Sequence, residues 1–139
     1  MNASMLSYIL LSCVLLSVQA QKCHVREIIL YTKYLLSETP ESCPCSETAD
    51  SPCSCLPIPE RGHELACFVE GTEHMLKNNM SSSDRLSKTL AMLNQSFQIQ
   101  QDRNLCKRLT QGKKCQYKTK GNVRRFLNEI LNTYQEIIK

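Results

Sequence analysis

The sequence of 139 residues contains no tryptophan, only four glycines and only 6% aromatic residues. It has no Asn-Gly or Asp-Gly hairpin signal, and the alternating pattern of a strand is absent throughout. It also lacks a Gly-x-Ser-x-Gly motif, a His-Glu-x-x-His motif and a glycine-rich phosphate loop. These absences argue against a β-rich fold and against the enzyme classes that such motifs define. We therefore expect a non-enzymatic protein whose function lies on a binding surface.

Charge is missing from the N-terminus, where residues 1–20 contain no Asp, Glu, Lys or Arg. The apolar run from Leu6 to Val18 is too short to span a bilayer comfortably. Val18-Gln19-Ala20 has the small–x–small pattern of a signal-peptidase site. No later apolar run is long enough for a membrane span. We expect a signal peptide over residues 1–20 and a secreted single domain over residues 21–139, with no membrane insertion.

Cysteine, in contrast, is abundant, with nine residues in the chain. Cys13 would leave with the signal peptide, and the remaining even number suits four disulfides in an oxidising compartment. These eight are Cys23, Cys43, Cys45, Cys53, Cys55, Cys67, Cys106 and Cys115. About a hundred pairings are possible, so connectivity stays open. The C-x-C spacing differs from the C-x2-C pairs of structural zinc sites, and we expect neither metal nor cofactor. Two sequons, Asn79-Met-Ser and Asn94-Gln-Ser, predict N-glycosylation at Asn79 and Asn94.

Apolar residues recur with helical spacing in four segments. The first runs over residues 25–36 and ends before Pro40. The second covers about residues 60–78. The third follows the capping run Ser81-Ser82-Ser83-Asp84 and carries Leu86, Leu90, Leu93 and Phe97 on one stripe. The fourth, the most strongly amphipathic, covers about residue 122 to the end. The predicted class is all-α.

The connections between these helices constrain the topology. The second and third helices are joined by roughly six residues, which predicts antiparallel neighbours. The first and last connections are about twenty residues each and hold six of the eight cysteines. Disulfides are therefore expected to order these loops. Two long crossovers favour an up-up-down-down four-helix bundle, with two disulfide-stapled crossover loops.

Charge is segregated along the chain. Residues 37–73 carry eight acids against the single base Arg61, whereas residues 103–128 carry nine bases and no acid. The predicted basic surface comprises Lys113, Lys114, Lys118, Lys120, Arg124 and Arg125. Either the two loops attract each other across the bundle, or the basic surface steers the protein toward an acidic receptor or heparin-like glycans. Nucleic acid is not expected, because this stretch has one aromatic residue before the final helix.

Arg124 and Arg125 oppose the helix dipole in the first turn of the fourth helix. The cost is a few tenths of a kcal/mol to about 1 kcal/mol each. A local rule broken without evident structural gain hints at a functional role. An alternative function is a cysteine-rich secreted binder, either a protease inhibitor or a cationic host-defence protein. The segment from Cys55 to Pro59 would supply the exposed rigid loop that an inhibitor needs.

Several segments together resemble the interleukin-9 family of short-chain, common γ chain cytokines. The segments are Gln21-Lys-Cys23, Cys43-Pro-Cys45, Cys53-Ser-Cys55-Leu-Pro-Ile-Pro59, Ala66-Cys67-Phe68, Asn104-Leu105-Cys106, Cys115 and Gly121-Asn122 before Phe126-Leu127. The family pattern has ten mature cysteines. This chain lacks one between Pro59 and Cys67 and another near Cys106 and Cys115. That paired loss corresponds to one whole disulfide, which would have joined the segment around Gly62 to the last long loop.

The resemblance implies a secreted monomer that assembles the interleukin-9 receptor α chain with the common γ chain. Signalling would run through Janus kinases and STAT factors in T cells, mast cells and other haematopoietic cells. The common γ chain would contact the first and fourth helices, with Gln135 as its main contact and Tyr134 and Asn132 beside it. For the α-receptor, the expected contacts are on the first and third helices, at Arg26, Lys33, Arg85 and Lys88.

Overall fold

The computed structural model describes residues 25–39, 43–47, 53–78 and 83–138. The helices within these ranges are α2 (Val25–Glu38), α3 (Glu64–Lys77), α4 (Asp84–Asp102) and α5 (Val123–Ile137), with a short 3-10 turn at Lys107–Leu109. The four predicted helices and the all-α class are confirmed, and the helix ends differ from prediction by a few residues. The expected signal peptide, Cys23 and Asn79 lie outside the described residues.

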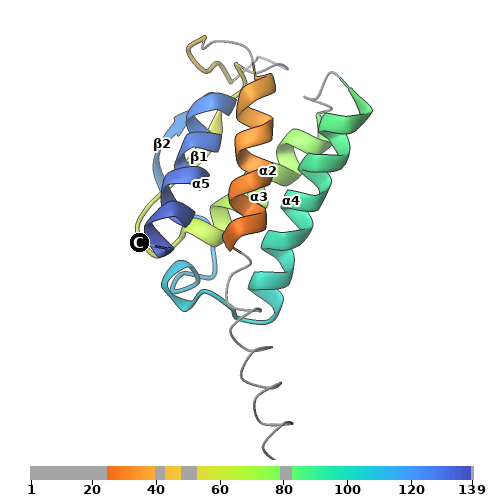
Figure 1. Ribbon diagram of the computed structural model, residues 1–139. Coiled ribbons are helices and arrows are strands. Elements are labelled where there is room, and N and C mark those ends of the chain that lie inside the picture. Colours follow the sequence, from red (N-terminus) through yellow and green to blue (C-terminus); the bar gives the residue numbers. More distant parts are fainter. Residues whose placement is uncertain (1–24, 40–42, 48–52, 79–82, 139) are drawn as a thin grey trace, which may run out of the picture.

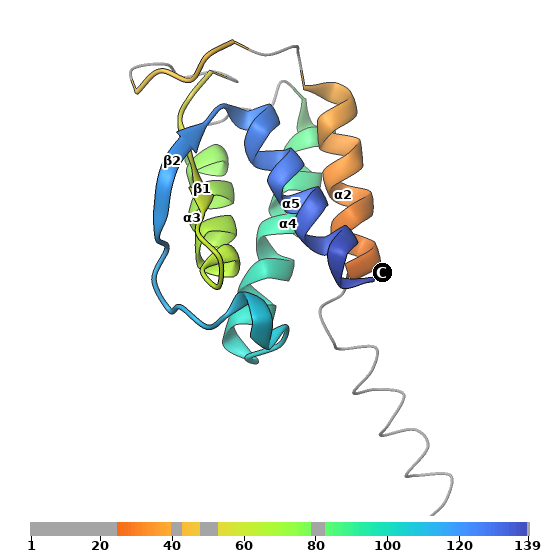
Figure 2. The same cartoon turned by 90° about the vertical axis from the view of Figure 1, so that its left-hand side faces the viewer.

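The helices form a bundle in which α2 and α3 run in one direction and α4 and α5 in the other (Figures 1 and 2). At one end, the Arg124 guanidinium in the first turn of α5 donates to the carbonyl oxygen of Thr39, just past α2, at 3.3 Å. At the other end, Tyr134 of α5 donates to Gln100 of α4 at 2.6 Å. The start of α5 therefore meets the end of α2, and α4 and α5 finish side by side.

Both C-terminal helices begin at a side-chain cap. Ser83 Oγ accepts from the backbone N–H of Leu86, as the Ser-rich run predicted. Asn122 Oδ1 accepts from the backbone N–H of Arg125. Each contact satisfies a backbone donor that the first helical turn leaves without a partner. The caps thus determine where α4 and α5 start.

The centre of the core is a cluster of buried aromatic rings. Phe68 of α3 lies 5.5 Å from Phe97 of α4, 6.0 Å from Phe126 of α5 and 6.2 Å from Tyr134, measured between ring centroids. All four side chains have no exposed area. Gly71, one turn after Phe68, lies against Phe126, because a Cβ on this glycine would be 2.2 Å from Phe126 Cζ. The cluster thus joins three helices, and the missing side chain of Gly71 makes room for it.

The described residues include two short strands, which correct the expectation that the chain has none. β1 (Leu56–Pro59) pairs antiparallel with β2 (Tyr117–Gly121), so the two long crossover loops are hydrogen-bonded to each other. The strand signal was masked because β1 has proline at alternate positions, 57 and 59. Alternate residues of a strand turn their backbone nitrogens to the same side, so prolines spaced by two are compatible with one side of β1 staying unpaired.

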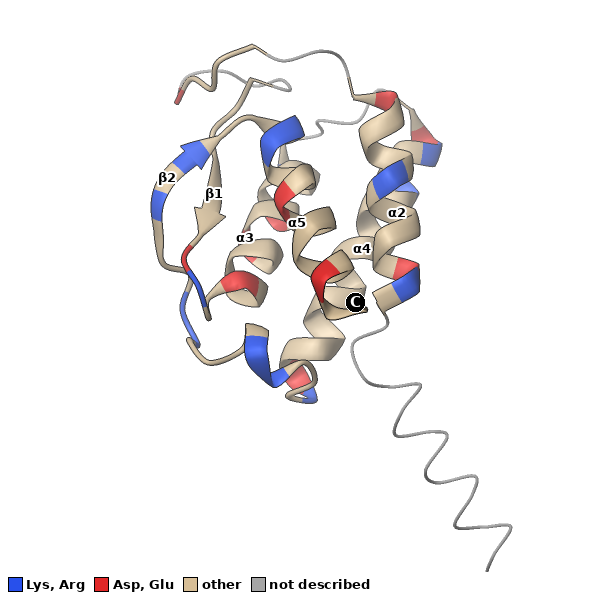
Figure 3. Cartoon of the chain, turned by 60° about the vertical axis from the view of Figure 1, so that its left-hand side comes forward, with Lys and Arg blue, Asp and Glu red and all other residues tan. Residues whose placement is uncertain are grey.

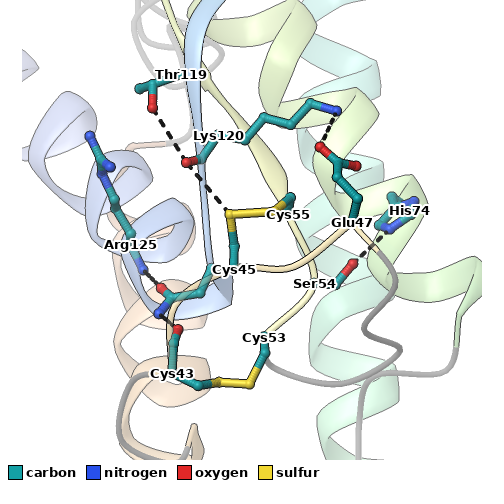
Figure 4. The surroundings of a disulfide bond; sticks show 11 residues. Cys43, Cys45, Glu47, Cys53, Ser54, Cys55, His74, Thr119, Lys120 and Arg125 are labelled. Carbon is teal, nitrogen blue, oxygen red and sulfur yellow. Dashed lines mark hydrogen bonds and ion pairs between the residues drawn. A yellow bond between two sulfur atoms is a disulfide. The ribbon is translucent and has the colours of Figure 1, made fainter.

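Disulfides join the loops in two ways. Cys43–Cys53 and Cys45–Cys55 close the first crossover on itself, with Cα–Cα distances of 5.5 and 4.9 Å (Figure 4). Cys67–Cys115 ties the first turn of α3 to the last connection, with a Cα–Cα distance of 4.5 Å. Cys106 is also disulfide-bonded. The expectation that disulfides order both crossovers is confirmed for these seven cysteines.

The segment around Gly62 contacts the last connection without a disulfide of its own. The backbone N–H of Gly112 donates to Gly62 O at 2.9 Å, and His63 Nδ1 donates to Lys114 O at 2.8 Å. Gly62 has φ of +88°, a backbone conformation that favours glycine. Hydrogen bonds therefore maintain this contact, at the place where the family resemblance implies that a disulfide has been lost.

Candidate interaction surfaces

The C-terminal helix carries the residues expected to bind the common γ chain. Asn132 is exposed and Gln135 is half-buried. Tyr134, however, has no exposed area, and its hydroxyl donates to Gln100 Oε1 at 2.6 Å. Burial raises the pKa of Tyr134 well above its usual range, so the hydroxyl stays protonated in the folded protein. Its side chain belongs to the core and is not available to a receptor, which corrects the expectation for this residue.

Gln135 lies on the side of α5 that runs along α2. Arg124, Asn128, Leu131 and Gln135 are spaced by four, three and four residues and so share one stripe of the helix. This stripe faces α2, because the Arg124 guanidinium bonds the Thr39 carbonyl oxygen just past the end of α2. The stripe therefore borders the seam between α2 and α5.

On α2 the predicted contacts Arg26 and Lys33 are both exposed. They share a stripe with Leu30, whose spacing from them is four and three residues. Leu30 is 66% exposed, the largest exposed fraction among the large apolar side chains of the described residues. Leu30 was not among the contacts expected from the sequence, although it lies between two charged residues on the polar face.

Arg85 and Lys88 at the start of α4 are also exposed. The guanidinium carbon of Arg85 lies 5.9 Å from the ring centroid of Tyr34, so Arg85 borders the seam between α2 and α4. Lys33 precedes Tyr34 and is rotated from it by about 100°, since an α-helix has 3.6 residues per turn. Lys33 is thus turned away from Arg85. The four residues expected to bind the α-receptor lie on two separate stripes.

The basic surface has four exposed members, Lys113, Lys114, Lys118 and Arg125. Basic positions on β2 and at the start of α5 lie on the same side of the molecule (Figure 3). Lys120 instead pairs with Glu47 at 3.3 Å, and its Nζ lies 5.4 Å from the ring centroid of Tyr117. The hydrogen bond to Glu47 raises the pKa of Lys120. This pair links the two loops of opposite charge, as the first interpretation predicted.

The structure explains why an arginine occupies position 124 in the first turn of α5. The last turn of α2 has no basic residue, and Arg124 supplies a positive charge there through its bond to Thr39 O. Cations are stabilised at the C-terminal end of a helix. The unfavourable position of Arg124 in α5 is therefore offset by a favourable position at the end of α2.

The two sequons differ in accessibility. Asn79 lies outside the described residues. Asn94 is only 6% exposed, and both hydrogens of its Nδ2 are used, toward Thr72 Oγ1 at 2.8 Å and Val69 O at 3.4 Å. Its Oδ1 accepts from Gln98 at 2.7 Å. An N-linked glycan would replace one of these hydrogens and would need space inside the helix packing. The expectation of a glycan on Asn94 is therefore incompatible with this fold.

We predict that Asn94 carries no glycan in the secreted protein. Mass spectrometry of the intact protein should give the same glycan mass for the parent and for Ser96→Ala, which destroys the sequon but leaves Asn94 in place. Asn94→Ala should lower the free energy of unfolding by about 1–3 kcal/mol, because Thr72 and Gln98 lose a buried partner. A Ser96→Ala protein lighter by one N-glycan would contradict this prediction.

The loop proposed for a protease inhibitor is not exposed. Leu56, Pro57 and Ile58 are buried, because β1 lies between β2 and the helices. An inhibitory loop must enter the active site of its protease, and a buried strand cannot do so. This finding removes the structural basis of the inhibitor alternative.

The chain is similar to known proteins over most of its length. Within the described ranges, no helix is both long enough and apolar enough to cross a bilayer. A family model described as Interleukin-9 matches residues 5–130. Human Interleukin-9 is 28% identical over 137 residues, which cover 95% of this chain and 92% of the human protein. No solved structure matches the chain. The chain belongs to the interleukin-9 family.

Proposed function

We propose that this protein is a secreted cytokine that acts by joining the interleukin-9 receptor α chain and the common γ chain. Receptor-bound Janus kinases then phosphorylate STAT factors in T cells, mast cells and other haematopoietic cells. The protein acts as a monomer and performs no catalysis. The observation that carries the proposal is the surface along the α2–α5 seam, which presents Gln135 and the exposed stripe of α2 on a rigid bundle.

The proposed contact with the common γ chain consists of Gln135 and Asn132. An uncharged amide on the flank of a packed helix has both a donor and an acceptor to offer a partner. Its helix is held by the buried contacts of Phe126, Ile130 and Tyr134, so little ordering is needed on binding. The α-receptor is assigned to the stripes of α2 and α4 that carry Arg26, Lys33, Arg85 and Lys88.

Gln135→Asp is expected to weaken binding of the common γ chain about tenfold, because a carboxylate replaces the amide donor with a charge that must be desolvated. Affinity for the α-receptor should stay within about twofold of the parent, since a distant contact contributes independently. Surface plasmon resonance on each receptor ectodomain measures both values. STAT phosphorylation in cells bearing both receptor chains should fall in parallel.

Gln95→Asp is the matched control, because Gln95 is an exposed glutamine on α4 that undergoes the same chemical change. It should leave common γ chain binding unchanged. Equal losses of both receptor affinities in Gln135→Asp, or no loss of either, would overturn the assignment of Gln135. Absence of STAT phosphorylation with the parent protein would overturn the proposed function itself.

A further inference from the structure

A groove of about 450 Å³ lies where β2 turns into α5. Three charged side chains line it, Lys120 from β2 and Arg124 and Arg125 from the first turn of α5, and all three are cations. Asn122 and Asn128 add amide groups, and Pro44 and Cys45 of the first crossover form the opposite wall. The groove therefore has a single sign of charge and polar hydrogen-bond donors. It is separate from the stripe end that carries Gln135.

The fold gives this groove a defined shape. The Asn122 side chain joins its two walls, because Nδ2 donates to Cys43 O at 2.6 Å while Oδ1 caps α5. Two disulfides hold the wall formed by the first crossover (Figure 4). A Cβ on Gly121 would lie 2.7 Å from Arg125 Cδ, so the missing side chain lets Arg125 fold against the strand–helix turn. The cations are thus held in place rather than spread over a mobile loop.

Structural contacts account for only two of the three cations. Arg124 donates to Thr39 O through Nη1, and Lys120 pairs with Glu47. Among the described residues, no hydrogen bond or ion pair engages the Arg125 guanidinium, although its backbone N–H is capped by Asn122. Arg125 also stands at the positive end of the α5 dipole, with no acid in the first turn. An anion bound in the groove would be attracted both to Arg125 and to the positive end of the α5 dipole, and would offset the repulsion between them.

The positive surface continues from the groove along β2. Lys118 is exposed at the irregularity of β2 opposite Ile58 and Pro59, and Lys120 follows two residues later at the edge of the groove. Lys113 and Lys114 precede them, also exposed. Exposed cations that follow one another along this segment and end in a groove fit an extended polyanion better than a single small anion.

We infer that the groove at the β2–α5 turn, together with Lys118, binds a sulfated glycosaminoglycan chain. Sulfate groups would occupy the positions beside Arg125 and Lys118, and the amides of Asn122 and Asn128 would bind sugar hydroxyls. Such a contact would retain a secreted cytokine near cell surfaces, and this inference rests on the proposed secretion. The groove shares Arg124 and Asn128 with the α5 stripe, but it does not require Gln135 or Asn132, the proposed receptor contacts.

The test is binding to immobilised heparin at 150 mM salt, followed by a salt titration. The double variant Lys118→Gln/Arg125→Gln should bind about tenfold more weakly, and the slope of log affinity against log salt should fall by about one for each cation removed. The control Arg85→Gln/Lys88→Gln removes two exposed cations from α4 and lowers the net charge equally. It should change the affinity less than about twofold, since it acts only through net charge.

The outcomes separate this inference from the proposed function. Equal losses in both double variants would show a net-charge effect and overturn the groove. Failure of the parent to bind heparin, or Lys118- and Arg125-dependent binding to phosphatidylserine vesicles alone, would also overturn it. STAT phosphorylation in cells without heparan sulfate should be the same for the parent and for Lys118→Gln/Arg125→Gln. A signalling defect of this variant in such cells would show that the groove also takes part in receptor binding. If the parent binds heparin but causes no STAT phosphorylation, the inference about the groove stands and the proposed cytokine function is wrong.

Discussion

Loss of the Cys67–Cys115 disulfide is expected to lower the free energy of unfolding by about 4 kcal/mol, the largest single effect predicted for this chain. The two cysteines are 48 residues apart, so the bridge strongly restricts the unfolded chain. In the folded protein it joins a buried position in the first turn of α3 to the connection that leads into β2 and α5. Cys67→Ala/Cys115→Ala, measured by chemical denaturation against the parent, gives this value.

The matched comparison is Cys43→Ala/Cys53→Ala, which removes a bridge between cysteines only 10 residues apart. The chain-entropy relation assigns this bridge about 3 kcal/mol, so the longer loop should cost about 1 kcal/mol more. Both double variants avoid a leftover thiol. A smaller loss for the Cys67–Cys115 pair than for the Cys43–Cys53 pair would contradict the expected order.

Gly71→Ala is expected to destabilise the protein by about 2 kcal/mol, although alanine is the better helix former. The new Cβ would lie 2.2 Å from Phe126 Cζ, and Phe126 is fully buried against Phe68. Either the ring or α3 must move; the ring has no exposed area, and α3 is held by its own buried face. Thermal and chemical denaturation of the variant give the size of the effect.

A second substitution tests whether the ring is the cause. Phe126→Leu makes room at the same place, so Gly71→Ala should cost about 1 kcal/mol less in that background than in the parent. Ala91→Gly on the exposed face of α4 measures the helix-propensity contribution alone and should destabilise by up to about 1 kcal/mol. Additive effects of Gly71→Ala and Phe126→Leu would show that the contact with the ring is not responsible.

The helices could be predicted because the apolar spacing and capping residues that specify each helix lie within its own segment of the sequence. In α5, Phe126, Leu127, Ile130 and Tyr134 recur with helical spacing and are all buried. The cap at Ser83 was readable for the same reason, since capping depends on a residue and the turn that follows it. Such signals involve residues close in the sequence and need no partner from elsewhere in the chain.

The errors fall where a distant partner decides the role of a residue. The Asn94 motif matches a glycosylation site, but Thr72 and Val69 of another helix bury its amide. The position of Arg124 against the α5 dipole indicated a functional role, but its guanidinium donates to the Thr39 carbonyl oxygen just past α2. Tyr134 was expected to contact the receptor beside Gln135, but consecutive helical residues point about 100° apart, and this side chain enters the core.

The sequence by itself determined the helical class, the oxidised cysteines and the family, because periodicity, cysteine spacing and motif order are properties of the chain alone. Only the tertiary structure decided which cysteines pair, that the two crossovers meet as β1 and β2, and that Lys120, Arg124 and Arg125 line one groove. These features join residues that are tens of positions apart. Their geometry depends on how the bundle brings loops together, and no local pattern encodes it.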